Sequence, residues 1–342
     1  MGYYAGIDVS CKEVFITIIN EEGEIVVKDT VYNEIYTIAA FFKKWQVPYE
    51  RIRIESGQLS IYLCKELKAR GLPVICVESH QMATLLKAWK MNKTDENDAC
   101  GIAQMMRAGL YKEVAIKSDQ ACEDKVMIGV RNQLLKITGR AQGEIRGLLK
   151  IYGITLGKRG ELFAFCQRIR EVIKRRKLSD GVVKSMECLL ITLESAAQQL
   201  AVIDETIIAL AKTDEDCQRL ATIPGVGELT AMTFKITIDD ATRFSESATV
   251  GAYIGLTPVS YASGEVAHSG SISKRGSAAC RTALFEAAFS LLTRCKKPSA
   301  LRSWGLKLLK KKGLNKAAVA VARKLAGIMH RMLIDKTEFC CL

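Results

Sequence analysis

The stretch YYAGIDVSCKEVFITIINEEGEIVVKDTVY at residues 3–32 decides the fold of the first part of the chain. It contains three β-rich runs, at 3–8, 14–20 and 24–32, with SCKE and EEG between them. Short runs with tight connections predict an antiparallel meander. Farther along, helical spacing alternates with short strands, at 34–45, 51–54, 59–70 and 73–77. The order βββαβαβα, with parallel later strands, predicts an α/β sheet of the ribonuclease H type.

Four acidic residues lie at the ends of these elements. Asp8 ends the first run, Glu55 ends the strand RIRIE, and Asp95 and Asp98 begin a helix in KTDENDA. A spacing of three residues places Asp95 and Asp98 on one helix face, and neighbouring strand ends bring all four carboxylates to one edge of the sheet. Clustered carboxylate oxygens suit Mg²⁺. This pattern predicts a metal site for cleaving a phosphodiester.

Each of these carboxylates also has a purely structural interpretation. Asp8 fits a turn, Glu55 a surface charge, and Asp95 a residue that complements the helix dipole. Their joint occurrence favours the metal site, because Asp8 and Glu55 directly follow hydrophobic runs, where a solvated carboxylate is a poor strand residue. If one ligand is misassigned, the available substitutes are Asp29, Glu78 and Glu96.

The pattern changes at residues 119–213, where strand signals vanish and apolar residues recur every three or four positions. Two long helices are predicted there, around a shorter basic stretch that ends near Ser179. Such an antiparallel coiled-coil arm more often mediates dimer contacts than chemistry. We expect three domains: 1–115 with the sheet, 116–213 as the helical arm, and 214–342 as a basic helical domain.

The charge of the chain is concentrated at its carboxyl end. The 342 residues carry a net charge of +13, of which residues 1–110 contribute 13 basic against 14 acidic side chains and residues 216–342 contribute 19 against 9. A neutral amino-terminal part joined to a basic carboxy-terminal part is expected when one carries chemistry and the other binds a polyanion. Nucleic acid is the predicted partner, and a solvated basic surface is the alternative.

Composition excludes several other classes of protein. With 49% hydrophobic and 25% charged residues, the chain has an ordinary globular composition. Its uninterrupted apolar runs are far shorter than the roughly 18 residues of a membrane span, and its first residues lack the features of a signal peptide. We therefore expect a cytoplasmic protein with no membrane partner. The 12 cysteines include no CxxC pair, which predicts small buried hydrophobic residues and neither zinc sites nor disulfides.

The carboxy-terminal third begins with LATIPGVGELTA, in which Pro224–Gly227 lies between two helical segments. This is a helix-hairpin-helix signature, in which Gly225 and Gly227 let the backbone amides of the next helix face a phosphate. A glycine-rich turn without a ligand is the alternative. After AYIGLTPV, the sequence SGEVAHSGSISKRGS predicts a polar loop that runs directly into a helix.

A set of ordered motifs carries a more specific resemblance. GIDVSCKE, RIESG and KTDENDA, then LATIPGVGELTA, YIGLTP and SGSISKRGSAACRTAL, follow one another along nearly the whole chain. In this order they resemble the DEDD-type transposases of the insertion-sequence one-ten family, relatives of the Piv/MooV invertases. The resemblance implies a RuvC-like Mg²⁺-binding domain, a coiled-coil arm, and a transposase domain with a nucleophilic serine. It also implies a non-coding bridge RNA that pairs with donor and target DNA.

Carried over to this sequence, the resemblance implies roles for individual residues. The metal-binding tetrad is matched by Asp8, Glu55, Asp95 and Asp98, and the nucleophile by Ser273 in SISKRG. Rival serines in the same loop are Ser269, Ser271 and Ser277. Basic side chains are expected to contact phosphates without reading sequence, at Lys274, Arg275, Arg281, Lys310, Lys311, Lys312, Lys316, Arg323 and Lys324. The chain departs from its relatives at Ser277 and Cys280, where Asn and Leu are common, and we expect altered packing there without loss of activity.

The resulting prediction is a bridge-RNA-guided transposase that cleaves and rejoins DNA through a covalent serine intermediate. The family implies dimers that pair into a tetramer, and a neighbouring subunit could supply the serine. Two enzymatic alternatives stay open: a Piv-like invertase without a guide RNA, and a junction-resolving nuclease in which metal-activated water is the nucleophile. A nucleic-acid-binding scaffold with a vestigial acidic cluster is the non-enzymatic alternative, and the presence of all four carboxylates argues against it.

Overall fold

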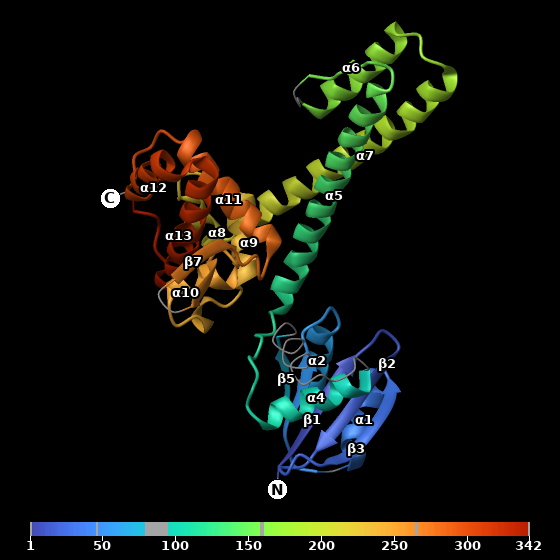
Figure 1. Ribbon diagram of the computed structural model, residues 1–342, viewed down its shortest axis with the longest axis vertical. Coiled ribbons are helices and arrows are strands. Elements are labelled where there is room, and N and C mark those ends of the chain that lie inside the picture. Colours follow the sequence, from blue (N-terminus) through green and yellow to red (C-terminus); the bar gives the residue numbers. More distant parts are fainter. Residues whose placement is uncertain (1, 46, 79–94, 158–160, 264–265, 341–342) are drawn as a thin grey trace. The chain divides into compact units, whose positions relative to one another are not determined.

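The computed structural model describes residues 2–45, 47–78, 95–157, 161–263 and 266–340. The chain divides into two compact units, Met1–Lys117 and Ser118–Leu342, whose elements are labelled in Figure 1. The second unit contains both the long helices of the arm and the carboxy-terminal helices. The expected division into three domains therefore stays a prediction.

A five-stranded mixed sheet forms the centre of the first unit. Its strands are β1 (Tyr3–Val9), β2 (Glu13–Ile19), β3 (Ile25–Tyr32), β4 (Tyr49–Glu55) and β5 (Val74–Val77), in the spatial order β3-β2-β1-β4-β5. The first three strands pair antiparallel, whereas β4 pairs parallel with both β1 and β5. This confirms the predicted mixed sheet of the ribonuclease H type, with boundaries within two residues of those expected for most of the elements.

Helices cover both faces of this sheet. The helices α1 (Ile35–Trp45) and α2 (Ser60–Ala69) bury their apolar side chains against Ala5 and Ile7 of β1. The helix α4 (Asp95–Arg107) packs on β1 and β2, and it contacts Gly6. Because successive strand residues point to opposite faces, α4 lies on the face opposite α1 and α2.

Three helices make the arm (Figure 1): α5 (Asp119–Lys150), α6 (Leu162–Arg175) and α7 (Asp180–Thr213). The two long helices α5 and α7 pack along each other, as predicted. Ser179, expected in a turn, is instead the residue that precedes α7. At the tip of the arm, Arg170 of α6 binds Glu187 and Glu194 of α7, each at 2.6 Å. These contacts hold α6 against α7.

One described helix, α7, is long and apolar enough to cross a membrane by length and composition. The sequence contains no uninterrupted apolar run of this length, because polar residues are spread among the apolar residues of α7. Two of those polar residues, Glu187 and Glu194, pair with Arg170, while Leu190 and Leu193 are buried in the arm. These contacts bury one side of α7, while only 22% of its most apolar window is buried and Ile191 and Val202 are exposed.

The carboxy-terminal part is built from helices around one core. They are α8 (Glu215–Ala221), α9 (Glu228–Ile238), a 3₁₀ turn at Ala241–Arg243, α10 (Ser247–Tyr253), α11 (Ala278–Thr293), α12 (Ala300–Lys312) and α13 (Leu314–Asp335). The core is formed by α9, α11 and α13. A close approach at Gly305 lets α12 join it, because a Cβ there would lie 2.7 Å from side-chain atoms of both Leu292 and Val321.

The predicted polar loop before α11 is wrong in part. The strands β6 (Pro258–Ser263) and β7 (Val266–Ile272) pair antiparallel across it. The many Gly and Ser residues lower the β-propensity of this segment, so its local sequence resembles a loop. The two strands are held together by their backbone pairing, which the side chains in the sequence do not indicate.

Burial of the cysteines agrees only partly with the expectation. Five described cysteines are buried, at 64, 76, 166, 217 and 280. Three others are exposed: Cys11, Cys188 and Cys340. Cys188 lies on α7 between Glu187 and Leu189 and is exposed. The cysteines within the described residues are free thiols.

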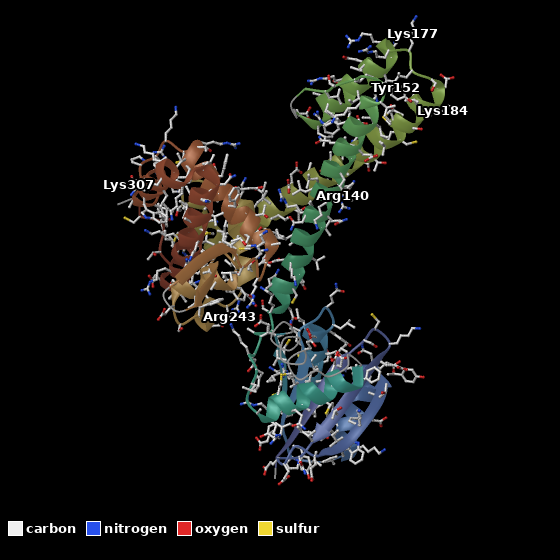
Figure 2. The ribbon with its side chains drawn as sticks, in the orientation of Figure 1. Arg140, Tyr152, Lys177, Lys184, Arg243 and Lys307 are labelled. Atoms are coloured by element: carbon white, nitrogen blue, oxygen red, sulfur yellow. The ribbon has the colours of Figure 1, made fainter. Side chains whose placement is uncertain are left out.

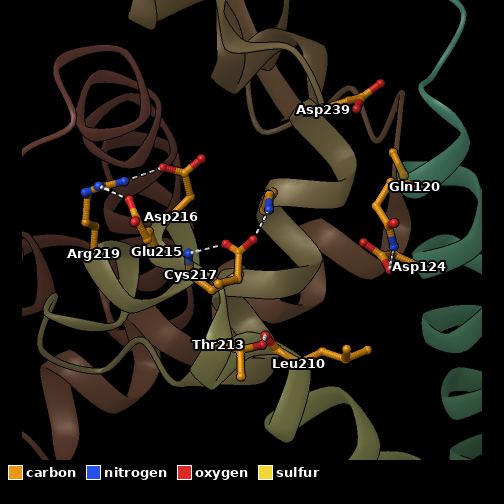
Figure 3. A network of polar contacts seen from close by, with 12 residues as sticks. Gln120, Asp124, Leu210, Thr213, Glu215, Asp216, Cys217, Arg219 and Asp239 are labelled. Atoms are coloured by element: carbon orange, nitrogen blue, oxygen red, sulfur yellow. Dashed lines mark hydrogen bonds and ion pairs between the residues drawn. The ribbon is translucent and has the colours of Figure 1, made fainter.

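Asp214 joins α8 to α9 and gives a testable pH dependence (Figure 3). Its carboxylate accepts a hydrogen bond from the Cys217 amide at 2.9 Å, which caps α8, and pairs with the Lys235 ammonium of α9. Burial would raise the pKa of Asp214, but the Lys235 ammonium and the Cys217 amide together hold that pKa below its ordinary value. The folded state is therefore stabilised while this carboxylate is ionised.

We expect Asp214→Ala to lower the free energy of unfolding by about 1–2 kcal/mol at pH 7. A folded pKa below the unfolded value, about 3.9, means that this difference is present above the unfolded pKa and disappears as pH falls through the folded pKa. Urea unfolding of both proteins across this range measures it. Glu215→Gln is the control, because the Glu215 side chain is 80% exposed and its pair with Arg219 contributes little. A gap that does not narrow as the pH falls below the unfolded pKa contradicts the assignment.

Candidate active site

Two of the predicted metal ligands lie side by side at the edge of the sheet. In the parallel pairing of β1 with β4, Gly6 is opposite Arg53 and Ile7 is opposite Ile54. The next residues in this register are Asp8 and Glu55, both half-buried. Side chains two residues apart share a face, so these two carboxylates point to the same face as Gly6. That face is the one covered by α4.

The absence of a side chain at Gly6 lets α4 lie directly on β1. A Cβ at this position would lie 2.3 Å from the Ala99 carbonyl oxygen and 2.8 Å from the Ala103 nitrogen. Both are backbone atoms of α4, so the helix itself would have to move. The glycine in GIDV is therefore the reason that the acidic helix approaches the strand that bears Asp8.

The direction of α4 brings its acidic end to the same edge. At its carboxyl end, Gln104 donates to the Gly23 carbonyl at 2.6 Å and Arg107 to the Glu21 carbonyl at 3.2 Å. These carbonyls lie in the β2–β3 turn, next to the start of β1 in the antiparallel sheet. The opposite end of α4, with Asp95 and Asp98, is thus directed toward the ends of β1 and β4.

The described side chains supply only part of the expected tetrad. Asp98 is half-buried near the start of α4, whereas the Asp95 side chain lies outside the described residues. Among the described side chains, no three His, Cys, Asp or Glu residues gather closely enough to hold a metal ion. The donors at this edge are nevertheless all carboxylate oxygens, which is the ligand chemistry that Mg²⁺ prefers.

The substitute ligands differ in position. Asp29 is exposed on β3, which β2 separates from β1. Glu78 directly follows β5, at the same edge of the sheet as Glu55. The Glu96 side chain lies outside the described residues. Asp29 is therefore poorly placed, and Glu78 lies at the correct edge but one residue beyond Val77, the partner of Glu55 in the register.

A buried arginine that the sequence did not single out lies beside this edge. Arg53 is 1% exposed, and its Nε and Nη1 have no hydrogen-bond partner within the described part of the chain. Its guanidinium carbon lies 6.0 Å from the centre of the Tyr111 ring. Burial lowers the pKa of Arg53 to about 10, against the opposing effect of Glu55. The sequence could have indicated it, because Arg53 lies within the short strand RIRIE, two residues before Glu55 and on the same face.

The geometry at Gly6 predicts a strong effect of one methyl group. We expect Gly6→Ala to displace α4, to lower the free energy of unfolding by about 1–3 kcal/mol, and to reduce DNA strand transfer more than this loss of stability explains. Thermal unfolding and a strand-transfer assay below the melting temperature separate the two effects. Gly57→Ala is the matched control, because a Cβ there meets no atom within 4 Å. An active Gly6→Ala protein would show that α4 need not approach β1.

The serine loop is held by two interlocking backbone turns. Ser273 follows β7, and its amide donates to the Thr257 carbonyl at 2.8 Å, while the Lys274 amide donates to the Gly255 carbonyl at 3.1 Å. A Cβ at Gly255 would lie 2.0 Å from the Arg275 carbonyl oxygen, and one at Gly276 would lie 2.2 Å from the Tyr253 carbonyl oxygen. The motifs YIGLTP and SKRG therefore fit against each other through their glycines.

The four serines of this segment have different surroundings. Ser277 caps α11, because its Oγ accepts from the Cys280 amide at 3.2 Å. Ser271 is exposed within β7, and the Ser269 side chain lies outside the described residues. Ser273 is half-buried at the end of the strand. Helix capping is thus the role of Ser277 and not of Ser273, and Cys280, where relatives commonly have Leu, is buried.

Arg281 of α11 donates hydrogen bonds to the backbone of this loop. Its Nη1 donates to the carbonyls of Ile254, Arg275 and Gly276 at 2.9, 2.8 and 3.1 Å. Three backbone acceptors at one nitrogen fix the guanidinium in place. The contact with a phosphate expected from the sequence stays a prediction, and the observed bonds tie the SKRG turn to the end of α10.

The two glycines of the PGVG turn have different surroundings. A Cβ at Gly225 would lie 2.7 Å from the Ala287 carbonyl of α11, and its φ of +91° favours glycine. Gly227 is exposed at the start of α9 with no atom within 4 Å of a Cβ. Packing accounts for Gly225, whereas Gly227 leaves the start of α9 open to a ligand.

Comparison with known proteins identifies the family. Two family models match: one described as transposase, of the IS110 DEDD group, over residues 5–154, and the transposase IS116/IS110/IS902 family over residues 217–304. The transposase for insertion sequence element IS1111A of Coxiella burnetii is 31% identical over 79% of this chain and 74% of its own length. This chain belongs to the IS110 family of transposases.

Other relatives of this IS110-family transposase share most of its length. A probable family 20 transposase of Pseudomonas aeruginosa is 27% identical over 87% of each chain. Among solved structures, RuvC of T. thermophilus with a Holliday junction substrate matches 33% of this chain and 100% of its own with 14% identity and a TM-score of 0.27. Its membership of this transposase family, and not the RuvC likeness, makes the protein an enzyme that cleaves and transfers DNA strands and that binds DNA.

The two matched regions of the transposase cover its two candidate centres. Residues 5–154 include the four carboxylates, and residues 217–304 include the PGVG turn and the serine loop. The basic side chains farther on are exposed on the last two helices. Lys310, Lys311 and Lys312 end α12, while Lys316, Arg323 and Lys324 lie on α13. Figure 2 labels Lys307, another exposed lysine of α12.

Proposed function

We propose that Ser273 is the nucleophile of this transposase and that Asp8, Glu55, Asp95 and Asp98 hold Mg²⁺. The proposal is supported above all by the direct packing of α4 on Gly6, because this contact directs the acidic end of α4 to the ends of the strands that bear Asp8 and Glu55. The carboxylate oxygens fit the ion, which supplies charge stabilisation for a scissile phosphate when bound.

In the covalent step, one bond to phosphorus forms as another breaks. The Ser273 Oγ–P bond forms while the P–O bond to the leaving DNA end breaks, and a base accepts the serine proton, for which a carboxylate of the acidic cluster is our candidate. The leaving DNA end later attacks the serine-linked phosphate of a partner strand, which releases Ser273. Lys274 and Arg275 next to the serine neutralise the phosphate under attack. Phosphates farther along the DNA are bound by Gly227 and by six basic side chains of α12 and α13: Lys310, Lys311, Lys312, Lys316, Arg323 and Lys324.

A guide RNA accounts for target choice in this proposal. The exposed cations on α12 and α13 supply affinity for phosphates without distinguishing bases. Base pairing between a non-coding bridge RNA and the donor and target DNA supplies that distinction, as in other RNA-guided systems. We further propose that the enzyme acts in the cytoplasm, as dimers joined through the arm and paired into a tetramer.

A covalent-trapping assay tests the function. The purified protein, Mg²⁺, labelled junction DNA and RNA transcribed from the non-coding sequence beside the gene are mixed and separated on a denaturing gel. We expect a protease-sensitive DNA adduct that requires the RNA. An adduct without RNA identifies a Piv-like invertase, and cleavage without any adduct identifies a junction nuclease that uses water. Either result overturns the corresponding part of the proposal.

A further inference from the structure

A groove in the second unit lies beside the serine loop. Its volume is about 1240 Å³, and it is lined by α12, α13, the start of α10 and the ends of β6 and β7. Ser271 and Ile272 of β7 form part of its wall, and Ser273 is the next residue of the chain. Whatever occupies this groove therefore lies next to the candidate nucleophile.

The charge of the lining selects an anion. Five cationic side chains, and no acidic one among the described lining residues, face the groove: Lys311, Lys312, Lys316, Arg323 and Lys324. None of the ion pairs found between described residues neutralises them. Such a concentration of positive charge attracts a polyanion and releases its counterions.

The rest of the lining is apolar and includes an aromatic ring. Trp304 and Leu308 of α12, Val319 of α13, and Ile272 lie between the cations. The Lys324 ammonium lies over the Trp304 ring, 4.8 Å from its centre, so the groove presents a cation next to an indole. Phosphates do not need an apolar surface. An unstacked base does, because it can stack on an aromatic ring while neighbouring cations follow the backbone.

We infer that this groove binds a short unpaired DNA strand, with a base against Trp304 and phosphates on the lysines of α12 and α13. A duplex fits the lining less well, because its base faces are stacked inside and cannot stack on Trp304. Ligand pockets of about 300–1000 Å³ hold one small molecule, so this groove has room for more than one nucleotide. The inference rests on the proposed function only in taking the strand to be that of the DNA cleaved by Ser273.

Binding of single strands without metal or guide RNA tests the inference. A labelled short oligothymidine is titrated with the full-length protein in EDTA at fixed salt, and a duplex of equal length is the competitor. We expect the single strand to bind more tightly, Trp304→Leu to weaken it roughly tenfold, and Trp304→Tyr to restore it. Strands that contain bromodeoxyuridine should crosslink to the groove, with the adduct mapped by mass spectrometry.

A matched pair of lysine variants on one helix tests the charge. Lys311→Gln should lower the slope of log affinity against log salt by about 0.7, whereas Lys307→Gln, on α12 but outside the groove lining, should leave it unchanged. Equal effects of the two variants, equal affinity of Trp304→Leu and the unchanged protein, or tighter binding of the duplex would each refute the inference. Tighter binding of oligouridine with the same crosslink overturns the assignment to DNA.

The outcomes separate this inference from the proposed function. The strand is bound without catalysis, so Ser273→Ala should keep the same affinity for oligothymidine. If Ser273→Ala loses the covalent adduct but Trp304→Leu binds normally, the groove assignment alone is wrong. If the groove variants behave as expected but Ser273→Ala still forms the adduct, the nucleophile assignment alone is wrong.

Discussion

Replacing Ser273 with alanine should abolish the covalent DNA adduct and lower strand transfer by at least about a thousandfold, because loss of a nucleophile removes a reaction step that nearby groups do not replace. The fold should persist, since the loop is held by backbone bonds of Ser273 and Lys274 that alanine retains. Denaturing gels of the trapping reaction, with thermal unfolding of the same protein, measure both quantities.

Two neighbouring serines serve as controls for this result. Ser271→Ala, two residues away on β7, should keep the adduct. Ser277→Ala should also keep it, while it lowers the free energy of unfolding by about 1 kcal/mol because α11 loses its cap. If the adduct survives in Ser273→Ala and disappears in Ser271→Ala, the nucleophile has been assigned to the wrong serine.

Asp8→Asn is expected to have a comparable effect on cleavage with little effect on folding. The amide keeps the size of the side chain at the end of β1 but removes the negative charge that a magnesium ion needs. We expect cleavage to fall by at least about a hundredfold and Mg²⁺ binding, measured by calorimetry on the full chain, to weaken. Asp29→Asn is the matched control, because Asp29 is exposed on β3, two strands from β1. Unchanged metal binding in Asp8→Asn contradicts the tetrad.

Mixing two inactive proteins tests whether subunits share a site. The acidic residues and Ser273 belong to different units of the chain. If a dimer or tetramer combines them from different subunits, Asp8→Asn mixed with Ser273→Ala should regain part of the cleavage that each has lost. Absence of rescue, with both proteins assembled in the mixture, shows that each chain uses its own residues.

Sequence patterns predicted the first unit well, because the signals there are local. Alternating apolar residues and short turns gave every strand of the sheet, and the ends of β1 and β4 located Asp8 and Glu55 next to each other in the register. The hairpin of β6 and β7 escaped prediction because Gly and Ser residues give a weak strand signal. The burial of Arg53 was not predicted either, since it depends on the elements that surround this residue.

The amino-acid sequence by itself determined the order of the elements in the first unit, the family and the candidate residues for the chemistry, because turn signals, apolar periodicity and ordered motifs are properties of neighbouring residues. Only the tertiary structure decided how α4 reaches the strand of Asp8 through Gly6, which serine caps α11, and that Trp304 and five cations share a groove beside Ser273. These features depend on contacts between residues far apart in the chain, whose distances no local pattern specifies.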